Sequence, residues 1–281
     1  MTAEPVEQPA PTSRAGRDLV SAVAVGAFLG IGVVLVPVLW VPWLFGVIVA
    51  VAMVIGAHEL RGALATRDIH VAWPPLYLGV AATVQAAYWW GPTAFLAVFA
   101  ATVLAVLGWR LVRGPEGYVA DASASVFTAA YTGLMGGFVG LMLVSSHGSP
   151  RVITFVVLTI CSDIGGYAAG VLAGRHPIAP RLSPKKSWEG FAGSLVLQAI
   201  AGVSLFVFWF DAPWWQGLLT GLVLTVTATA GDFVESAIKR DLGVKDMSNL
   251  LPGHGGLMDR LDSLLPNAFM AWLLLRVFLG P

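Results

Sequence analysis

Long apolar runs recur along most of this chain of 281 residues, and they constrain its fold more than any single motif. Hydrophobic residues make up 57% of the sequence and charged residues only 11%. A helix needs about 20 consecutive apolar residues to cross the hydrocarbon core of a bilayer. The runs are continuous rather than alternating, which argues against a transmembrane β-barrel. We therefore predict an all-α, polytopic integral membrane protein.

The apolar runs predict about nine transmembrane helices, separated at Pro and Gly residues that interrupt helices. The nine spans cover residues 18–38, 41–62, 71–91, 93–112, 119–145, 151–174, 188–209, 214–238 and 258–279. Residues 1–17 are rich in proline and poor in large apolar side chains, so we expect them to form a disordered tail.

The basic residues orient these spans. If the chain crosses the membrane nine times, all of the 16 Lys and Arg residues except Arg151 and Arg276 lie on the same side of the membrane as the N-terminus. Cytoplasmic loops carry the excess of Lys and Arg in membrane proteins. We therefore predict a cytoplasmic N-terminus, cytosolic loops after the even-numbered spans, and a C-terminus on the far side. The formal net charge is zero, and we expect no nucleic-acid partner.

Carboxylates gather at the cytoplasmic ends of the last predicted spans. Asp232 and Glu235 share one face of the eighth span, because residues three apart lie on the same side of a helix. Asp259 and Asp262 share a face at the start of the ninth span, and Asp163 lies deeper in the sixth. Charge is costly next to lipid, so we interpret this group as a functional site. The alternative is an ion-paired network that only holds the two last spans together, a task that apolar packing performs at lower cost.

Several carboxylates in one place repel one another unless a cation neutralises them. Hard oxygen ligands favour Mg²⁺, Ca²⁺ or Mn²⁺ over zinc. The single cysteine, Cys161, is interpreted as a small buried apolar residue rather than a ligand. The sequence therefore predicts a hard-metal site, with Asp163, Asp232, Asp259 and Asp262 as candidate ligands.

Basic residues around the carboxylates indicate that the metal would bind a polyphosphate, as in phosphoryl transfer. Residues 183–187 are expected to form a compact turn that ends in Ser187, a helix N-cap, and a helix N-terminus flanked by Lys is a natural phosphate site. The chain contains neither GxxxxGK[ST] nor GxGxxG, so neither a P-loop nor a Rossmann site is expected. Candidate contacts to the substrate are Ser183, Lys185, Lys186, Ser236, Lys245, His254 and Arg260.

Other features favour packing or placement over chemistry. Gly166, Gly170 and Gly174 recur on one face of the sixth span, where they would let another helix backbone approach closely. Glu59 follows His58 near the cytoplasmic end of the second span, and we interpret both as lying at the membrane interface. His254 lies in a glycine-rich loop, where a contact to phosphate or ribose and a structural role remain equally open.

The residues that follow resemble the signature of the phosphatidate cytidylyltransferases, also called CDP-diacylglycerol synthases. Their signature runs Ser-x-aliphatic-Lys-Arg, four residues, Lys-Asp-x-small, two residues, aliphatic-Pro-x-His-Gly-Gly-aliphatic-x-Asp-Arg-aliphatic-Asp. The matching residues are Ser236, Ile238, Lys239, Arg240, Lys245, Asp246, Ser248, Leu251, Pro252, His254, Gly255, Gly256, Leu257, Asp259, Arg260, Leu261 and Asp262. The run Ser183-Pro184-Lys185-Lys186-Ser187-Trp188-Glu189-Gly190 is similar to the family's second motif. The resemblance covers about residues 150–280, and no position departs from the signature.

The resemblance implies transfer of CMP from CTP to phosphatidic acid, with release of pyrophosphate, by a homodimer among the lipids of the inner membrane. It also implies Mg²⁺ together with a second cation such as K⁺, bound by Asp232 and Asp259, with Asp262 and Asp163 as further candidates. Lys239 and Arg240 are the remaining candidate catalytic residues. We accordingly divide the chain into residues 18–148, which hold the first five spans, and a catalytic unit at 149–281.

Two alternatives use the same features differently. A CTP-dependent kinase of a polyprenol or similar lipid alcohol would bind the same nucleotide but would attack its γ-phosphate with a hydroxyl, which needs a general base. A cation-coupled transporter would be expected to show an inverted repeat with paired broken helices, and we find none in the sequence. A CDP-alcohol phosphatidyltransferase is disfavoured, because its Asp-Gly-x-x-Ala-Arg run is absent.

Overall fold

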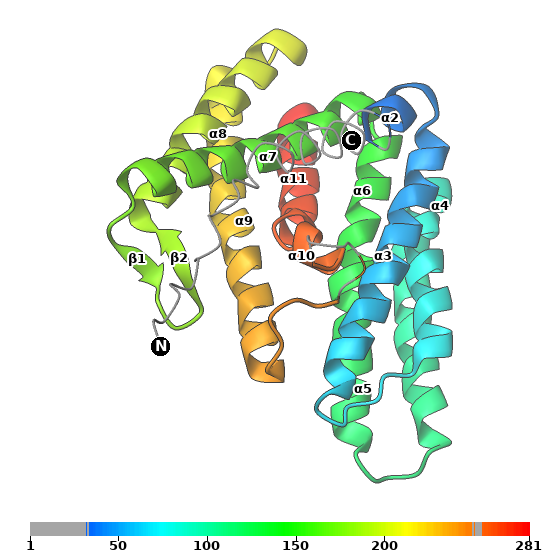
Figure 1. Ribbon diagram of the computed structural model, residues 1–281. Coiled ribbons are helices and arrows are strands. Elements are labelled where there is room, and N and C mark those ends of the chain that lie inside the picture. The colour runs from blue at the N-terminus through cyan, green and yellow to red at the C-terminus, as the bar shows by residue number, and fades with distance from the viewer. Residues whose placement is uncertain (1–31, 33, 249, 251–254) are drawn as a thin grey trace, which may run out of the picture.

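The computed structural model describes residues 32, 34–248, 250 and 255–281, and these form helices over most of their length (Figure 1). Within those residues, seven helical stretches are long and apolar enough to cross a membrane. The predicted class, an all-α polytopic membrane protein, is confirmed. The seven stretches are Pro42–Ala65, Trp73–Leu111, Tyr118–Leu143, Gly148–Ala173, Trp188–Trp209, Trp214–Leu242 and Met258–Leu279.

The helices form two groups with the last long helix between them (Figure 1). The first group consists of α2 (Val36–Trp40), α3 (Pro42–Ala65), α4 (Trp73–Leu111), α5 (Tyr118–Thr128), the π-helical segment η2 (Ala129–Leu134) and α6 (Met135–Val144). The second consists of α7 (Gly148–Ala173), the strands β1 (Pro177–Ala179) and β2 (Ser183–Ser187), α8 (Trp188–Trp209) and α9 (Trp214–Leu242). The short α10 (Met258–Leu261) leads into α11 (Leu264–Leu279), which contacts α6, α7 and α9.

The long helix α4 is folded back on itself at Gly91, where the backbone has a φ of 75° that glycine adopts readily. Gly79 and Thr102 lie against each other, since a Cβ built on Gly79 would lie 2.1 Å from Thr102 Cγ2. In a straight helix these two residues would be roughly 35 Å apart. The two arms therefore correspond to the predicted spans 71–91 and 93–112. The first predicted span and the N-terminal tail fall largely outside the described residues, so the count of nine and the cytoplasmic N-terminus stay predictions.

Glycine lets the backbones of α7, α8 and α9 touch. A Cβ on Gly165 would lie 2.5 Å from the carbonyl oxygen of Gly193 in α8, and a Cβ on Gly202 would lie 2.3 Å from that of Gly217 in α9. The expected close approach along Gly166 and Gly170 is confirmed, with α8 as the partner helix. Gly174 lies against the carbonyl group of Gly170 and against the hydroxyl of Ser187, the N-cap residue of α8. This packing fixes the ends of three helices relative to one another.

The segment between α7 and α8 is a small antiparallel hairpin of β1 and β2. The prediction of a compact turn over residues 183–187 is wrong, because these residues form the extended strand β2. The predicted N-cap is confirmed: Ser187 Oγ accepts a hydrogen bond of 3.1 Å from the amide of Gly190. The Glu189 carboxylate accepts hydrogen bonds from the backbone amides of Arg175 and His176 and so fastens the hairpin to the start of α8.

The two groups of helices share a buried core that reaches the end of α9. Leu60 of α3, Leu76 of α4, Leu242 of α9 and Met258 of α10 belong to one buried cluster. Beside it, Arg67 donates a hydrogen bond of 2.5 Å from Nη2 to the carbonyl oxygen of Asp241. The first half of the chain thus packs against the end of α9 and the start of α10.

Candidate active site

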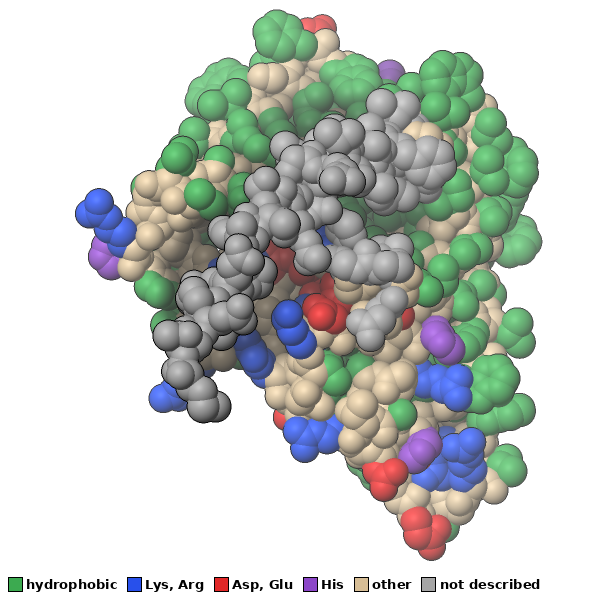
Figure 2. All heavy atoms as spheres, in the orientation of Figure 1, with side chains coloured by type: hydrophobic (Ala, Val, Ile, Leu, Met, Phe, Trp, Pro, Cys, Tyr) green, Lys and Arg blue, Asp and Glu red, His purple; other side chains and the backbone are tan. Residues whose placement is uncertain are grey.

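A cavity of about 480 Å³ opens between α7, β2, α8, α9 and α10. In Figure 2, acidic and basic side chains gather near the centre of the face shown, whereas hydrophobic side chains cover much of its upper and right-hand parts. The structure therefore brings residues from the sixth, eighth and ninth predicted spans to one place. Predicted site residues on its wall are Asp163, Lys185, Lys186, Asp232, Ser236, Asp259, Arg260 and Asp262.

Lys186 reaches from the hairpin into the carboxylates of the cavity. Its ammonium forms an ion pair with Asp232 of α9 and lies 5.5 Å from the centre of the Phe233 ring. Burial lowers the pKa of the Lys186 ammonium, while the charges of Asp262 and Asp163 act in the opposite direction. The Lys186 ammonium thus lies within the electrostatic field of four acidic residues, Asp163, Asp232, Glu235 and Asp262.

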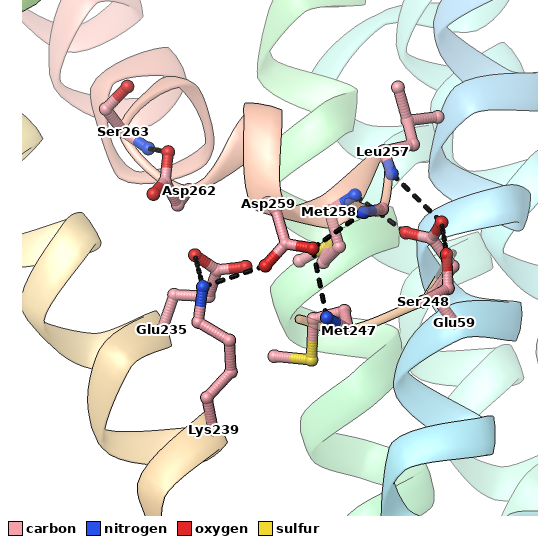
Figure 3. Close-up of polar contacts among 11 residues, drawn as sticks. Glu59, Glu235, Lys239, Met247, Ser248, Leu257, Met258, Asp259, Asp262 and Ser263 are labelled. Carbon is pink, nitrogen blue, oxygen red and sulfur yellow. Dashed lines mark hydrogen bonds and ion pairs between the residues drawn. The ribbon is translucent and has the colours of Figure 1, made fainter. Parts of the chain in front are cut away.

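Lys239 joins α9 to α10 on another side of the site (Figure 3). Its Nζ donates hydrogen bonds to Glu235 Oε2 at 3.0 Å and to Asp259 Oδ1 at 2.8 Å. The Glu235 side chain is only 1% exposed, so its charge is neutralised within the protein rather than by water. Lys239, which the sequence analysis proposed as a catalytic residue, here balances two carboxylates.

Asp259 is held by several donors. Its Oδ2 accepts hydrogen bonds from the backbone amides of Met247 at 3.0 Å and Gly256 at 2.7 Å, in addition to the Lys239 contact on Oδ1 (Figure 3). Asp262 accepts a hydrogen bond of 2.8 Å from the amide of its neighbour Ser263. Because a carboxylate has about four acceptor positions, the three bonds to Asp259 leave it limited capacity for a further ligand.

The donor set of the cavity fits a hard cation in its chemistry. Asp163, Asp232 and Asp262, together with the hydroxyls of Ser162 and Ser236, supply only oxygen ligands. Among the described residues, no three acidic, His or Cys side chains converge on one point as a ready-made cage. Mg²⁺ is ordinarily bound by one or two carboxylates plus substrate phosphates and water, so such a cage is not required for it.

Some predicted residues are not on the wall of this cavity. Ser183, Arg240 and Lys245 do not line it, and both Arg240 and Lys245 are exposed to solvent. His254 lies outside the described residues, so its role stays a prediction. The structure also adds cavity residues that were not predicted, which are Ser162, Gly166, Tyr167, Gly190, Phe191, Ser194 and Thr229 among others. Thr229 lies three positions before Asp232, and this helical spacing was the signal that could have identified it.

Glu59 makes contacts that the sequence did not predict. Its side chain is buried within the protein at 4% exposure, and its depth relative to the membrane interface stays a prediction. Its carboxylate accepts hydrogen bonds from Ser248 and from the backbone amides of Leu257 and Met258 (Figure 3). Its neighbour His58 is exposed and contacts Tyr77. The only available signal was a carboxylate inside an apolar span.

Comparison with known proteins agrees with this arrangement. The model of the Cytidylyltransferase family matches residues 21–278. A phosphatidate cytidylyltransferase from Mycobacterium tuberculosis is 43% identical over 299 residues, covering 98% of this chain and 90% of the relative. The phosphatidate cytidylyltransferase from Mycobacterium leprae is 42% identical, covering 95% of this chain and 90% of the relative. One from Staphylococcus haemolyticus is 38% identical over 146 residues, which are 52% of this chain and 55% of the relative.

The bridge made by Lys239 predicts a coupled stability effect. Replacing Lys239 with Met leaves Glu235 and Asp259 without their shared cation, and we expect the folded protein to lose about 3–5 kcal/mol. The additional change Glu235→Gln should restore part of this loss, because it removes one of the two stranded charges. Thermal unfolding of the purified protein in detergent measures both effects, with exposed Lys245→Met as the control. Strictly additive shifts in the double variant would contradict the bridge.

Proposed function

The chain belongs to the cytidylyltransferase family, and on that premise we propose that it transfers CMP from CTP to phosphatidic acid, giving CDP-diacylglycerol and pyrophosphate. The observation that carries this proposal is the single cavity where carboxylates of α7, α9 and α10 meet Lys185 and Lys186 of β2. A site of this kind suits a reaction between two phosphorylated substrates, one dissolved in water and one held in a bilayer.

The reaction needs little covalent help from the protein. A phosphate oxygen of phosphatidic acid attacks the α-phosphorus of CTP, and the bond to the β-phosphate oxygen breaks as pyrophosphate leaves. The attacking oxygen already carries charge, so no activated Ser or Cys is required. The work of the enzyme is to hold two anions together and to offset the charge that develops on pyrophosphate. Lys185, Lys186 and Arg260 line the cavity and are the residues proposed for this task.

A divalent cation completes the proposed site. Asp232 and Asp259 would hold Mg²⁺, with Asp262 and Asp163 as further candidate ligands and a second cation such as K⁺ beside it. When bound, the metal would neutralise and orient the phosphates of CTP. The oxygen-only donor set and the cavity shared with basic residues support this assignment.

We place the reaction at the cytoplasmic face of the inner membrane and propose that the enzyme is a homodimer. The chain is a multi-pass membrane protein, and its Lys and Arg residues are concentrated on the predicted cytosolic side. CTP is a charged, water-soluble substrate, whereas phosphatidic acid remains in the bilayer. The cavity includes Tyr167, which is 75% exposed, so one wall lies open at the surface of α7.

The decisive experiment follows two labels from CTP into lipid. Purified protein in mixed micelles with phosphatidic acid should transfer label from cytidine into the lipid fraction. Label placed on the γ-phosphate should leave as pyrophosphate. Transfer of the γ-label to a polyprenol or similar lipid alcohol, without transfer of cytidine, would instead support the lipid kinase.

Metal removal and an acidic-to-amide change test the cation. EDTA should abolish turnover and excess Mg²⁺ should restore it. Asp232→Asn should lower turnover by about 100-fold or more, because it removes a charge that acts on the cation in the transition state. Asp241→Asn, an exposed position near the end of the same helix, serves as the matched control. Turnover that persists in EDTA, or a near-normal Asp232→Asn variant, would refute the metal assignment.

The proposed orientation is testable by reporter fusions. A reporter joined after Pro281 should be active only on the far side of the membrane, and one joined to the N-terminus only in the cytosol. A fusion between α9 and α10 is unsuitable, because that segment carries the site. A cytosolic C-terminus would contradict the nine-span topology and with it the cytoplasmic active site.

A further inference from the structure

Glu59 connects the first half of the chain to the candidate active site. It lies on α3, yet its Oε1 accepts hydrogen bonds from Ser248 Oγ at 2.5 Å and from the amide of Leu257 at 2.9 Å. Its Oε2 accepts a hydrogen bond of 2.7 Å from the amide of Met258 (Figure 3). These contacts bridge 189 to 199 positions of sequence, so they arise only from the tertiary fold.

The segment that Glu59 contacts is the one that carries Asp259. Glu59 accepts hydrogen bonds from the amides of Leu257 and Met258. Asp259 accepts hydrogen bonds from the amides of Gly256 and Met247. The two carboxylates therefore hold the same short stretch of backbone through neighbouring amides. Because amides buried without a partner are unfavourable, each carboxylate restricts the paths that this stretch can follow.

Close packing leaves the segment little alternative position. A Cβ built on Gly256 would lie 2.9 Å from both carboxylate oxygens of Glu59, so any larger residue would push that carboxylate from its place. Met258 is fully buried, and a Cβ on Gly56 of α3 would lie 2.9 Å from its sulfur. The backbone at residues 256–258 is thus held against α3 by the hydrogen bonds to Glu59 and by the packing of the Met258 side chain.

We infer that Glu59 is a positioning residue for the active site. It fixes the stretch 256–258, and through it the Asp259 carboxylate that meets Lys239 at 2.8 Å and the cavity residues that follow. This inference rests on the proposed function for its catalytic readout. Glu59 itself is not on the wall of the cavity formed by the described residues, so it acts through the backbone that it holds.

The kinetic test compares Glu59→Gln and Glu59→Ala with the wild type in the CTP-to-lipid assay. Removing a partner that orients a metal ligand typically lowers activity or metal affinity by about 10–100-fold. We expect Glu59→Ala to show a loss of that size in kcat and a raised Mg²⁺ concentration for half-maximal rate. The loss in Glu59→Gln should be smaller, because its carbonyl oxygen still accepts one of the amides. The KM for phosphatidic acid should change least.

Controls separate positioning from folding. Glu116→Gln removes an exposed carboxylate far along the sequence from the site and should behave as the wild type. Rates are compared only for protein that elutes as a single species in size-exclusion chromatography. If Glu59→Ala does not fold, Glu59→Gln and Ser248→Ala decide the question, because both keep side-chain volume close to the original. Wild-type kcat and Mg²⁺ dependence in folded Glu59→Gln and Ser248→Ala would overturn the inference.

A second readout does not depend on turnover. Hydrogen–deuterium exchange of the peptide covering 255–262 should be at least about 10-fold faster in Glu59→Gln than in the wild type, since one of the two amides bound by Glu59 loses its acceptor. Unchanged exchange in that peptide would overturn the inference even if activity falls. Wild-type protein that fails to convert CTP would refute the proposed function, and the exchange experiment would still decide whether Glu59 holds this segment.

Discussion

The candidate site depends on one ammonium group placed between two carboxylates. Lys239 links Glu235, which is almost fully buried, to Asp259 on the next element. An isolated carboxylate at such a position would be strongly destabilised, because the interior solvates charge poorly. The bridge makes the acidic face of α9 compatible with burial, and it also fixes the distance between α9 and α10. The remaining carboxylates, Asp232 and Asp262, can then face the cavity, because they are not needed to form ion pairs within the core.

The geometry around that bridge comes from both halves of the chain. Glycine contacts between α7, α8 and α9 bring the hairpin with Lys186 over the end of α9, where it meets Asp232. On the opposite side, Glu59 of α3 holds the amide of Leu257, and Arg67, which follows α3, holds the carbonyl group of Asp241 near the end of α9. The first spans are therefore more than membrane anchors. They form the surface against which the signature segment is arranged.

Local patterns in the sequence predicted what local forces determine. Apolar runs of membrane length gave the helices, Gly91 and Pro92 marked the fold in α4, and Ser187 was recognised as an N-cap from its place before Trp188 and Glu189. The acidic residues of α9 and α10 were grouped by helical spacing and by matching cytoplasmic ends. Each of these inferences uses neighbours within a few turns, where helix geometry alone fixes which side chains share a face.

Contacts over long sequence separations could not be predicted in the same way. The position of Glu59 beside Leu257 depends on how α3 packs against the linking segment, and no periodicity in either stretch records it. Lys186 was expected to bind phosphate, but its pairing with Asp232 depends on β2 being extended rather than a turn. Under the proposed function, a cation at Asp232 would give that carboxylate a second positive partner, and Lys186 could then turn part of its hydrogen bonding to a phosphate. A cation at Asp232 and a phosphate at Lys186 would therefore favour each other.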